Sequence, residues 1–292
     1  MKTAAILRTV ASDPCPKCGS AVPISSRECP VCSRQLGFPN VRMAERVSET
    51  SALKQRLAAA EASVEALGAK DHFLAFLRAT SKSQAVMNRS LGALSGWLTA
   101  PNPLFASYFR QVEAGRQPDG SEWDEQRGAA EATINPYCYK ELNYAALTLD
   151  GGGITYYGPY SVMLKEVTIE DRASVFEENP FIFNQRHHVV SGTSPPLGFR
   201  APWSDRSAVA GAKLFQKINA ATEDIAFPEI LMDSRRSEPQ CDFVEVHIYG
   251  PVNRAGIETV RGPKPMRRPD QAIWQQAVRI LKNAQTKVEE VT

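Results

Sequence analysis

The sequence predicts an α+β protein built from a small cysteine-rich unit, a helical segment and a mixed domain with a mainly antiparallel sheet. Two closely spaced cysteine pairs lie near the N-terminus, and apolar residues then recur at helical spacing. From about residue 140, apolar and polar residues alternate as they do in strands. Helices first and strands later favour the α+β class. We expect units at 13–36, 41–70 and 71–292.

Composition restricts the class of protein. The chain has 292 residues, of which 43% are hydrophobic and 23% charged, as in globular proteins with a buried core. No apolar run approaches the roughly 20 residues that span a bilayer. The apolar patch within 1–13 is interrupted by Arg8, which disfavours a secretory leader. We therefore expect a cytoplasmic protein without a membrane segment.

Charge gives little information about partners. The chain has 34 Lys and Arg residues against 32 Asp and Glu residues, a formal net charge of +2. Proteins dedicated to nucleic-acid binding usually carry a strongly basic surface. The balance therefore argues only against tight, non-specific binding of nucleic acid.

Four of the six cysteines form two C-x2-C pairs, Cys15 with Cys18 and Cys29 with Cys32. Each tight turn offers two thiolates, and Zn²⁺ prefers four such ligands at tetrahedral angles. Two disulfides or a redox pair are the alternatives. The lack of a recognisable leader disfavours disulfides, and the lack of a βαβ pattern disfavours the redox motif. The spacing predicts a structural zinc site with no open coordination position.

The unit at 13–36 resembles the zinc ribbons and rubredoxin-like knuckles found at the ends of many bacterial proteins. The resemblance implies a module that binds protein, binds nucleic acid, or caps a fold. The other two cysteines, Cys138 and Cys241, have no partner nearby in sequence, and we expect buried thiols there.

The segment at 41–67 has a short apolar seam at alternating spacings of four and three residues. The seam consists of Leu53, Leu57, Ala60, Val64 and Leu67. It extends over about two heptads, fewer than the three to four that identify a coiled coil. The seam is compatible with a homodimer contact, with an amphipathic spacer, and with a helix packed on its own domain. We expect the helix at 41–67 to project from the main domain or to lie loosely against it, with the seam as a dimer contact or a brace for the cysteine-rich unit.

Local patterns place the remaining elements along the chain. Apolar spacing predicts a helix over 71–98, which Pro101 and Pro103 end. A turn-rich loop occurs at 115–122, and Pro228 and the run 235–240 bound a short apolar segment at 230–232. The predicted strands are 143–149, 154–157, 160–167 and 242–249, and the later predicted helices are 204–220 and an amphipathic C-terminal helix from Asp270.

The strand at 242–249 carries a polar face. Val244, Val246 and Ile248 share one face of this strand. The opposite face consists of Phe243, Glu245, His247 and Tyr249. A carboxylate, an imidazole and a phenol on one face are typical of a cleft floor, and an ordinary solvent-exposed face is the alternative.

Two further segments carry side chains suited to an anionic, aromatic ligand. Arg172 and Ser174 follow a predicted strand, where the planar guanidinium can hold a pyrophosphate. Tyr156 and Tyr157 could stack on a base or a nicotinamide ring. Arg200 lies in a segment rich in charged and aromatic residues before the predicted helix at 204–220.

The segments YGPYSVMLK, DRAS and VEVHIYGPV occur in this order between about residues 140 and 262. In this respect the chain resembles the enzymatic half of bacterial ADP-ribosyltransferase-like toxin and effector domains. The resemblance implies that Arg172 or Arg200 grips NAD⁺, that Ser174 is the serine of the supporting strand, and that Glu245 stabilises the oxocarbenium-like transition state. The predicted site comprises Glu245, His247 and Ser174 as catalytic groups and Arg172, Arg200, Tyr156, Tyr157 and Tyr249 as NAD⁺ contacts.

The sequence therefore predicts a transferase tethered to a zinc ribbon, which uses NAD⁺ to modify a macromolecular target. The first alternative is a non-enzymatic adaptor that binds protein or nucleic acid through the ribbon. The second is a metal-dependent nuclease that uses Asp242 and Glu245, although these two residues face opposite sides of a regular strand. Convergence of Glu245, Arg172 and Arg200 in one cleft would favour an enzyme.

Overall fold

The computed structural model describes residues 12–102, 104–115, 122–234 and 241–291; for 122–126 it describes the backbone helix alone. Three features that the sequence singles out therefore fall outside the described residues. They are the apolar patch within 1–11, residues 116–121 of the turn-rich loop, and the run 235–240.

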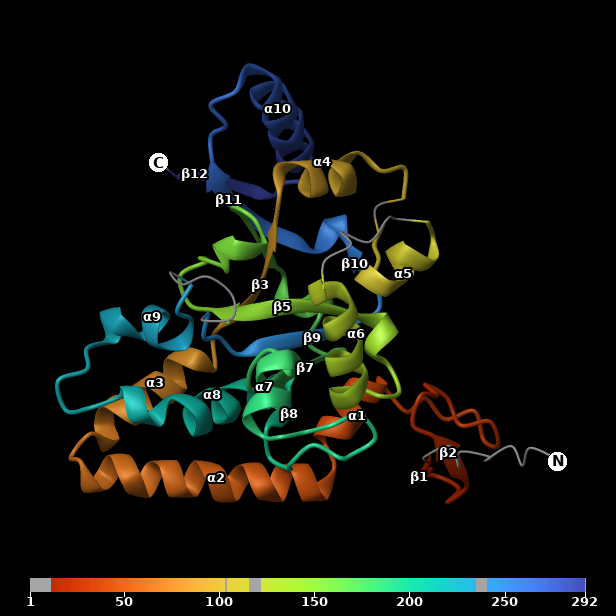
Figure 1. Cartoon of the computed structure of the whole chain (residues 1–292), viewed down its shortest axis with the longest axis vertical. Coiled ribbons are helices and arrows are strands. Elements are labelled where there is room, and N and C mark those ends of the chain that lie inside the picture. Colours follow the sequence, from red (N-terminus) through yellow and green to blue (C-terminus); the bar gives the residue numbers. More distant parts are fainter. Residues whose placement is uncertain (1–11, 103, 116–121, 235–240, 292) are drawn as a thin grey trace.

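An eight-stranded sheet organises the described chain, with strand order β12-β11-β6-β3-β5-β9-β7-β8 (Figure 1). Every neighbouring pair is antiparallel except β11 and β12. The predicted α+β class with a mainly antiparallel sheet is confirmed. The strands are β3 (Gln84–Arg89), β5 (Leu142–Thr148), β6 (Tyr160–Leu164), β7 (Ala173–Phe176), β8 (Arg200–Pro202), β9 (Glu245–Tyr249), β11 (Ile257–Pro263) and β12 (Lys287–Val291).

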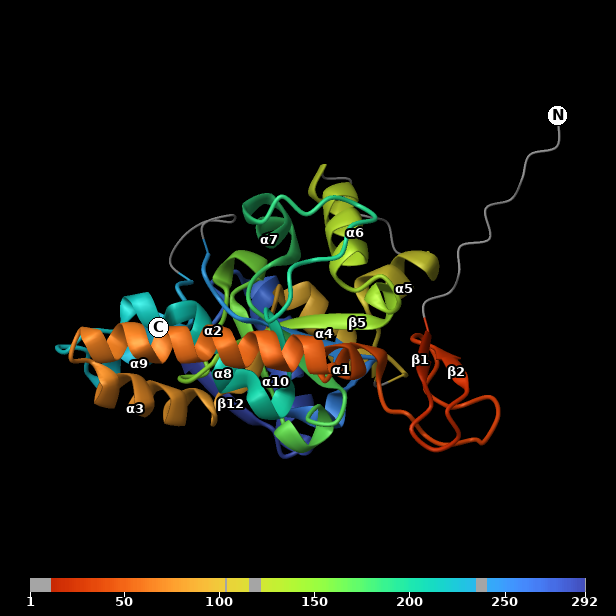
Figure 2. The same cartoon turned by 90° about the horizontal axis from the view of Figure 1, so that it is seen from below.

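Helices cover both sides of this sheet. The long helix α2 lies along one side together with α3 and α8, whereas α6 and α7 lie together on the other side (Figure 2). The helices are α1 (Pro39–Ala44), α2 (Val47–Ala66), α3 (Lys70–Thr80), α4 (Leu91–Thr99), α5 (Tyr108–Glu113), α6 (Glu122–Ile134), α7 (Pro180–Arg186), α8 (Arg206–Leu214), α9 (Phe227–Leu231) and α10 (Arg268–Asn283). None of the described helices combines the length and apolar character needed to cross a bilayer. Short strands β1 (Ser12–Pro14) and β2 (Ala21–Pro23) form a separate hairpin, and β4 (Leu104–Phe105) pairs with β10 (Val252–Asn253).

The helix predicted over 71–98 is wrong in its middle. Helix α3 ends at Thr80, where the Ser83 hydroxyl donates a hydrogen bond to the Thr80 carbonyl. The next residues form β3, which pairs with both β5 and β6. Helical spacing of apolar residues continues through this segment, but the hydrogen bonds of two neighbouring strands override it. Ser90 then caps α4 by accepting a hydrogen bond from the backbone amide of Ala93.

Three other predicted elements differ from the structure in smaller ways. The strand expected at 154–157 is a 3-10 turn at Thr155–Tyr157, and the helix expected over 204–220 consists of α8 flanked by 3-10 turns at Trp203–Asp205 and Phe215–Lys217. The C-terminal helix forms as α10 and ends at Asn283, so Val288, which the helical spacing of apolar residues from Asp270 also includes, lies in β12 instead.

The apolar seam of α2 faces the core of the large domain. Leu53 is 5% exposed and Val64 fully buried, and both belong to the same apolar cluster as α3, α8 and the sheet. Leu67, the last residue of the seam, is 67% exposed. The helix therefore packs on its own domain, in contrast to the expected loosely attached spacer.

Helix α1 joins the cysteine-rich unit to the sheet. The Asn40 side-chain amide is 1% exposed and donates hydrogen bonds to the carbonyls of Arg172 and His247 and to the Ser174 hydroxyl. Two residues later, Arg42 donates to the Ser26 carbonyl and pairs with Asp13 at 3.1 Å. The cysteine-rich unit is thus attached to strands β7 and β9 through one short helix.

The position of the α2 seam predicts unequal effects of two identical substitutions. Leu53→Ala removes a buried side chain and should lower the free energy of unfolding by about 2–5 kcal/mol. Leu67→Ala changes an exposed side chain in the same seam and should alter it by less than about 0.5 kcal/mol. Urea unfolding followed by circular dichroism measures both; equal losses would contradict the packing of α2 on the domain.

Candidate functional site

The two cysteine pairs fold into matching turns. In the first, the amide of Gly19 donates to the Cys15 carbonyl; in the second, the amide of Ser33 donates to the Cys29 carbonyl, both at 2.9 Å. Gly19 and Ser33 both have positive φ, at 71° and 53°, which lets the chain reverse directly behind each pair. The repeated local geometry turns all four thiols inward.

The four sulfur atoms lie within 4.8 Å of one another, and all four cysteines are free. Cys15 Sγ is 3.7 Å from Cys32 Sγ, and Cys18 Sγ is 3.6 Å from Cys29 Sγ. Sulfur atoms on a tetrahedron with Zn–S bonds of about 2.3 Å would be separated by about 3.8 Å. The cluster therefore suits a tetrahedral metal ion such as Zn²⁺. Among the described residues it is the one group of three or more His, Cys, Asp or Glu side chains so arranged.

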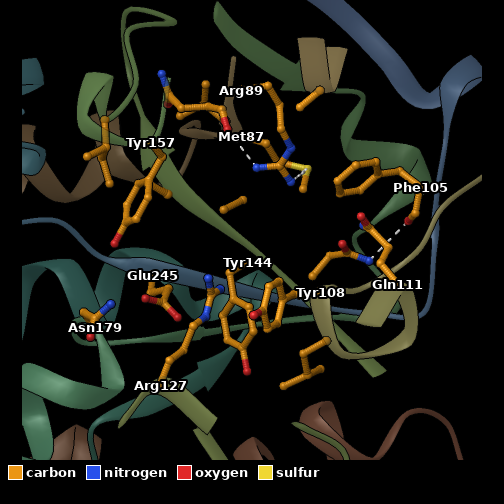
Figure 3. Close-up of a pocket in the computed structure, with 18 of the residues that line it drawn as sticks. Met87, Arg89, Phe105, Tyr108, Gln111, Arg127, Tyr144, Tyr157, Asn179 and Glu245 are labelled. Carbon is orange, nitrogen blue, oxygen red and sulfur yellow. Dashed lines mark hydrogen bonds between the residues drawn. The ribbon is translucent and has the colours of Figure 1, made fainter. Parts of the chain in front are cut away.

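A cavity of ≈ 1110 Å³ lies over the face of β3, β5 and β9, under helices α4, α5, α6 and the start of α7. Cavities of about 300–1,000 Å³ hold drug-sized ligands. Figure 3 shows Arg89 and Phe105 at one end and Glu245, Arg127, Tyr157 and Asn179 around the other. The cavity thus combines aromatic walls with charged groups of both signs.

The register of the central strands places Glu245 on the floor of this cavity. Ala146 of β5 lies directly opposite Glu245, and Tyr144 lies opposite His247. Directly opposite residues share a face of the sheet. The small Ala146 side chain leaves room in front of the Glu245 carboxylate, which is itself only 4% exposed. The alternative of an ordinary solvent-exposed face is therefore wrong.

Helix α6 brings a second carboxylate to the cavity. Glu131 is 3% exposed and forms an ion pair with Arg127 one turn earlier, at 2.5 Å between Oε1 and Nε. Burial raises the pKa of Glu131, Arg127 opposes this, and nearby Glu245 adds to it. Burial and the charges of Glu131 and Glu245 raise the pKa of Tyr144. Within the described chain, the buried atoms Glu131 Oε2 and Tyr144 Oη form no hydrogen bond of regular geometry, although the two side chains lie close enough for each to affect the pKa of the other. An uncompensated buried polar atom costs free energy, so these atoms are available to a ligand.

His247 lies behind Glu245 and does not line the cavity. Its Nε2 is 3.1 Å from Glu245 Oε1, and its Nδ1 is 3.1 Å from Asn135 Nδ2. Burial lowers the pKa of His247 to about 3, and the charge of Arg200 acts in the same direction.

A glycine-rich loop brings Tyr156 and Tyr157 to the cavity. The Asn88 side chain donates to the carbonyl of Gly158 at 3.0 Å and fixes the loop against β3. A Cβ at Gly158 would lie 2.2 Å from the Arg89 backbone, and one at Gly153 would lie 1.9 Å from Asn88 Oδ1. Glycine is required at Gly158 because the two backbones approach this closely, whereas a side chain at Gly153 would displace the Asn88 side chain.

The predicted residues separate into two groups. Glu245, Tyr156 and Tyr157 line the cavity. Ser174 lies directly opposite His247 on the neighbouring strand, on the same face as Glu245, but it is buried and accepts a hydrogen bond from Asn40.

Arg172, Arg200 and Tyr249 lie outside the cavity lining. Arg172 donates to the carbonyls of Thr168, Tyr249 and Pro251. Arg200 is 5% exposed, pairs with Glu49 and donates to the carbonyl of Ile134. Tyr249 packs against Phe38 with ring centroids 5.4 Å apart. Of the three residues whose convergence would favour an enzyme, Glu245 alone reaches the cavity.

The residues expected of a nuclease are also separated. Asp242 pairs with Lys213 and Lys217 at 2.5 and 2.6 Å and does not line the cavity. These two lysines hold the pKa of Asp242 below its usual value despite burial, which by itself raises it.

Sequence reasoning missed Arg89, Arg127, Glu131 and Asn135. Arg89 fell inside the segment predicted as continuous helix, although Ser90 is a typical helix cap after a strand. Arg127, Glu131 and Asn135 recur every four residues, which places them on one face of a helix and was a signal available in the sequence.

No protein-family model matches the chain, and no curated protein matches it. The site is therefore interpreted from its own geometry.

The cysteine cluster predicts one zinc ion per chain. The double substitution Cys15→Ser, Cys29→Ser removes the two buried ligands and should abolish bound zinc, measured by inductively coupled plasma mass spectrometry. Cys241→Ser, outside the cluster, should leave the zinc content at one per chain. The sheet should remain folded in both variants, because its apolar core is separate from that of the cysteine unit. Stoichiometric zinc in the double variant would contradict the assignment.

Proposed function

We propose that the protein transfers ADP-ribose from NAD⁺ to a macromolecular target, with Glu245 as the group that stabilises the transition state. One observation carries the proposal: a carboxylate that is 96% buried forms part of the floor of a ligand-sized cavity. Buried carboxylates facing cavities are over-represented in functional sites, because their desolvation must be offset by a role.

The chemistry requires few groups. The bond between the ribose C1′ and the nicotinamide nitrogen breaks, its electron pair leaves with nicotinamide, and positive charge develops on the ribose. A nucleophile of the target then adds at C1′ and releases its proton. A fixed carboxylate in a site that excludes water stabilises the developing cation more strongly than it would in bulk water. Glu245 has this position.

Arg89 is the cavity arginine suited to the diphosphate. Its guanidinium lies 4.6 Å from the Phe105 ring centroid and donates to the carbonyl of Asn88, which fixes its direction. Arginine binds phosphate oxygens through a planar fork. Arg89 therefore takes the role that the resemblance gave to Arg172 or Arg200, whose guanidinium groups are engaged elsewhere.

The cavity also supplies a second acidic group. In the family that the sequence resembles, a Glu or Gln stands two residues before the catalytic Glu, where this chain has Phe243. Glu131 reaches the same cavity from α6, and its buried Oε2 is available to accept a hydrogen bond from a ribose hydroxyl or from the incoming nucleophile. This arrangement supports a transfer site formed by Glu245 on β9 and Glu131 on α6.

The zinc ribbon is the proposed docking site for the macromolecular target. Val31, between the two cysteines of the second pair, is 68% exposed. An exposed apolar side chain held on a rigid, metal-bound turn is suited to contact with a partner. Val31→Asp should therefore reduce labelling of targets in a lysate of the source organism, while hydrolysis of NAD⁺ in the absence of target stays unchanged. Equal target labelling would exclude Val31 from docking.

Glu245→Gln keeps the shape of the side chain and removes its charge. The loss of one such electrostatic group typically lowers the rate by about 10²–10³-fold. We expect this loss in the cleavage of NAD⁺, measured by release of nicotinamide, with the melting temperature nearly unchanged. The matched control Glu258→Gln alters an exposed carboxylate on β11 and should keep full activity.

Equal activity of the two variants would remove Glu245 from the mechanism. If the wild-type protein neither binds nor cleaves NAD⁺, the transferase proposal fails and the non-enzymatic adaptor becomes the better explanation.

A further inference from the structure

Three buried side chains form a hydrogen-bonded line that ends at the cavity. Asn135, His247 and Glu245 are 1%, 2% and 4% exposed. Asn135 Nδ2 is 3.1 Å from His247 Nδ1, and His247 Nε2 is 3.1 Å from Glu245 Oε1. Asn135 directly follows α6, and the other two lie on β9, so the line joins the roof of the cavity to its floor.

The chemistry of the amide determines the protonation of the ring. An amide nitrogen donates hydrogen bonds and does not accept them, so the atom that faces Asn135 Nδ2 must be an acceptor. His247 Nδ1 therefore carries a lone pair and no proton. A neutral imidazole with an unprotonated Nδ1 carries its proton on Nε2, which is the nitrogen that faces Glu245.

We infer that Asn135 locks His247 as the neutral Nε2–H tautomer, and that this N–H is donated to Glu245 to hold its carboxylate ionised and aimed into the cavity. His247 is thus a positioning residue, because it does not reach the ligand space itself. The tautomer of His247 and the ionised state of Glu245 are inferred without the proposed function. Only the reaction in which Glu245 takes part rests on it.

The surroundings of the ring support a fixed, neutral imidazole. The ring stacks on Phe176 at 5.7 Å between centroids and meets Tyr144 edge-on at 5.1 Å. Asn40 holds the backbone carbonyl of His247. These contacts restrict rotation of the side chain and keep Nε2 directed at Glu245.

The charged and titratable groups around the line come from three elements. Arg200 on β8 disfavours a positive charge on His247, and Glu131 on α6 favours one. Burial, together with the charge of Arg200, outweighs Glu131 and lowers the pKa of His247 to about 3, so the ring stays neutral over the pH range in which the protein would act. Arg127 on α6 and Tyr144 on β5 face the Glu131 side of the cavity.

The hydrogen bond has a definite effect on Glu245. A donor that binds the ionised form of a carboxyl group lowers its pKa. If the donor is lost, the pKa of Glu245 rises, and activity that requires the carboxylate is lost at a higher pH as the solution is acidified. If His247 had a purely structural role, its loss would lower activity at every pH but would not shift the pH at which activity is lost on acidification.

The first test reads the tautomer directly. Two-dimensional ¹H–¹⁵N spectra of the zinc-loaded full-length protein, with His247→Phe used to assign the signal, should show a protonated Nε2 and an unprotonated Nδ1 at neutral and mildly acidic pH. A protonated Nδ1, or an imidazolium, would overturn the inference. This measurement needs no NAD⁺ and remains decisive if a variant does not fold.

The second test measures the consequence. Asn135→Ala removes the lock and should convert the single tautomer into a mixture. It should also shift the acid limb of the pH profile of NAD⁺ cleavage upward by about one pH unit. The matched control Asn184→Ala removes another amide that contacts α6, at the Ala130 carbonyl, and should leave the limb in place.

The two possible failures are distinguishable. If the wild type does not cleave NAD⁺, the proposed function fails, and the pKa of Glu245 is read instead from ¹³C carboxyl spectra of the wild type and Asn135→Ala. An unchanged pKa of Glu245 together with an unchanged tautomer in Asn135→Ala would overturn the inference whatever the activity.

Discussion

The buried carboxylate of Glu245 is the constraint on which the arrangement of the central strands and of α6 depends. A carboxylate that is 4% exposed must be compensated by nearby polar groups. His247 lies two residues along the same strand and meets it at 3.1 Å. The ring in turn needs a partner for Nδ1, which Asn135 at the end of α6 supplies. Arg200 on β8 also donates to the Ile134 carbonyl at that end, so the end of α6 is fixed to the same sheet that forms the floor of the cavity.

The same strands connect the site to the cysteine-rich unit. Asp13 pairs with Arg42 and Arg46, and such partly exposed ion pairs contribute about 0–1 kcal/mol each. The buried amide of Asn40 adds hydrogen bonds to the carbonyls of Arg172 and His247, and the Arg172 carbonyl also accepts one from the Tyr249 amide. Helix α1 therefore connects the cysteine turns to the backbone of His247, two residues from Glu245.

The predictable parts of the molecule depend on local sequence. The zinc ligands lie within one short stretch, and the faces of 242–249 follow from strand alternation, so Glu245 and the cysteine cluster could be predicted. The remaining site residues come together through packing. Residues 84–89 look helical until β5 and β6 pair with them, and that error concealed Arg89. The spacing of Glu131 and Asn135 places them on one face of a helix, but their contact with the site depends on the packing of α6 over β9. Arg172 and Arg200 have a suitable chemistry in sequence but donate to backbone carbonyls in the fold.

The distribution of charge in the cavity bears on the class of ligand. Arg127 pairs with Glu131, so this pair contributes little net charge at its end of the cavity. The other two charged side chains that line the cavity, Arg89 and Glu245, lie at different ends of it (Figure 3). A neutral sugar has no charged group to pair with either of these two side chains. A ligand with an anionic part and a cationic part would match both ends at once, with complementary electrostatics fixing its direction. The NAD⁺ of the proposed function would have this polarity, with its diphosphate near Arg89 and its cationic ring near Glu245. In that direction of binding, the ribose C1′ would lie beside Glu245, the carboxylate that we propose Asn135 and His247 to orient.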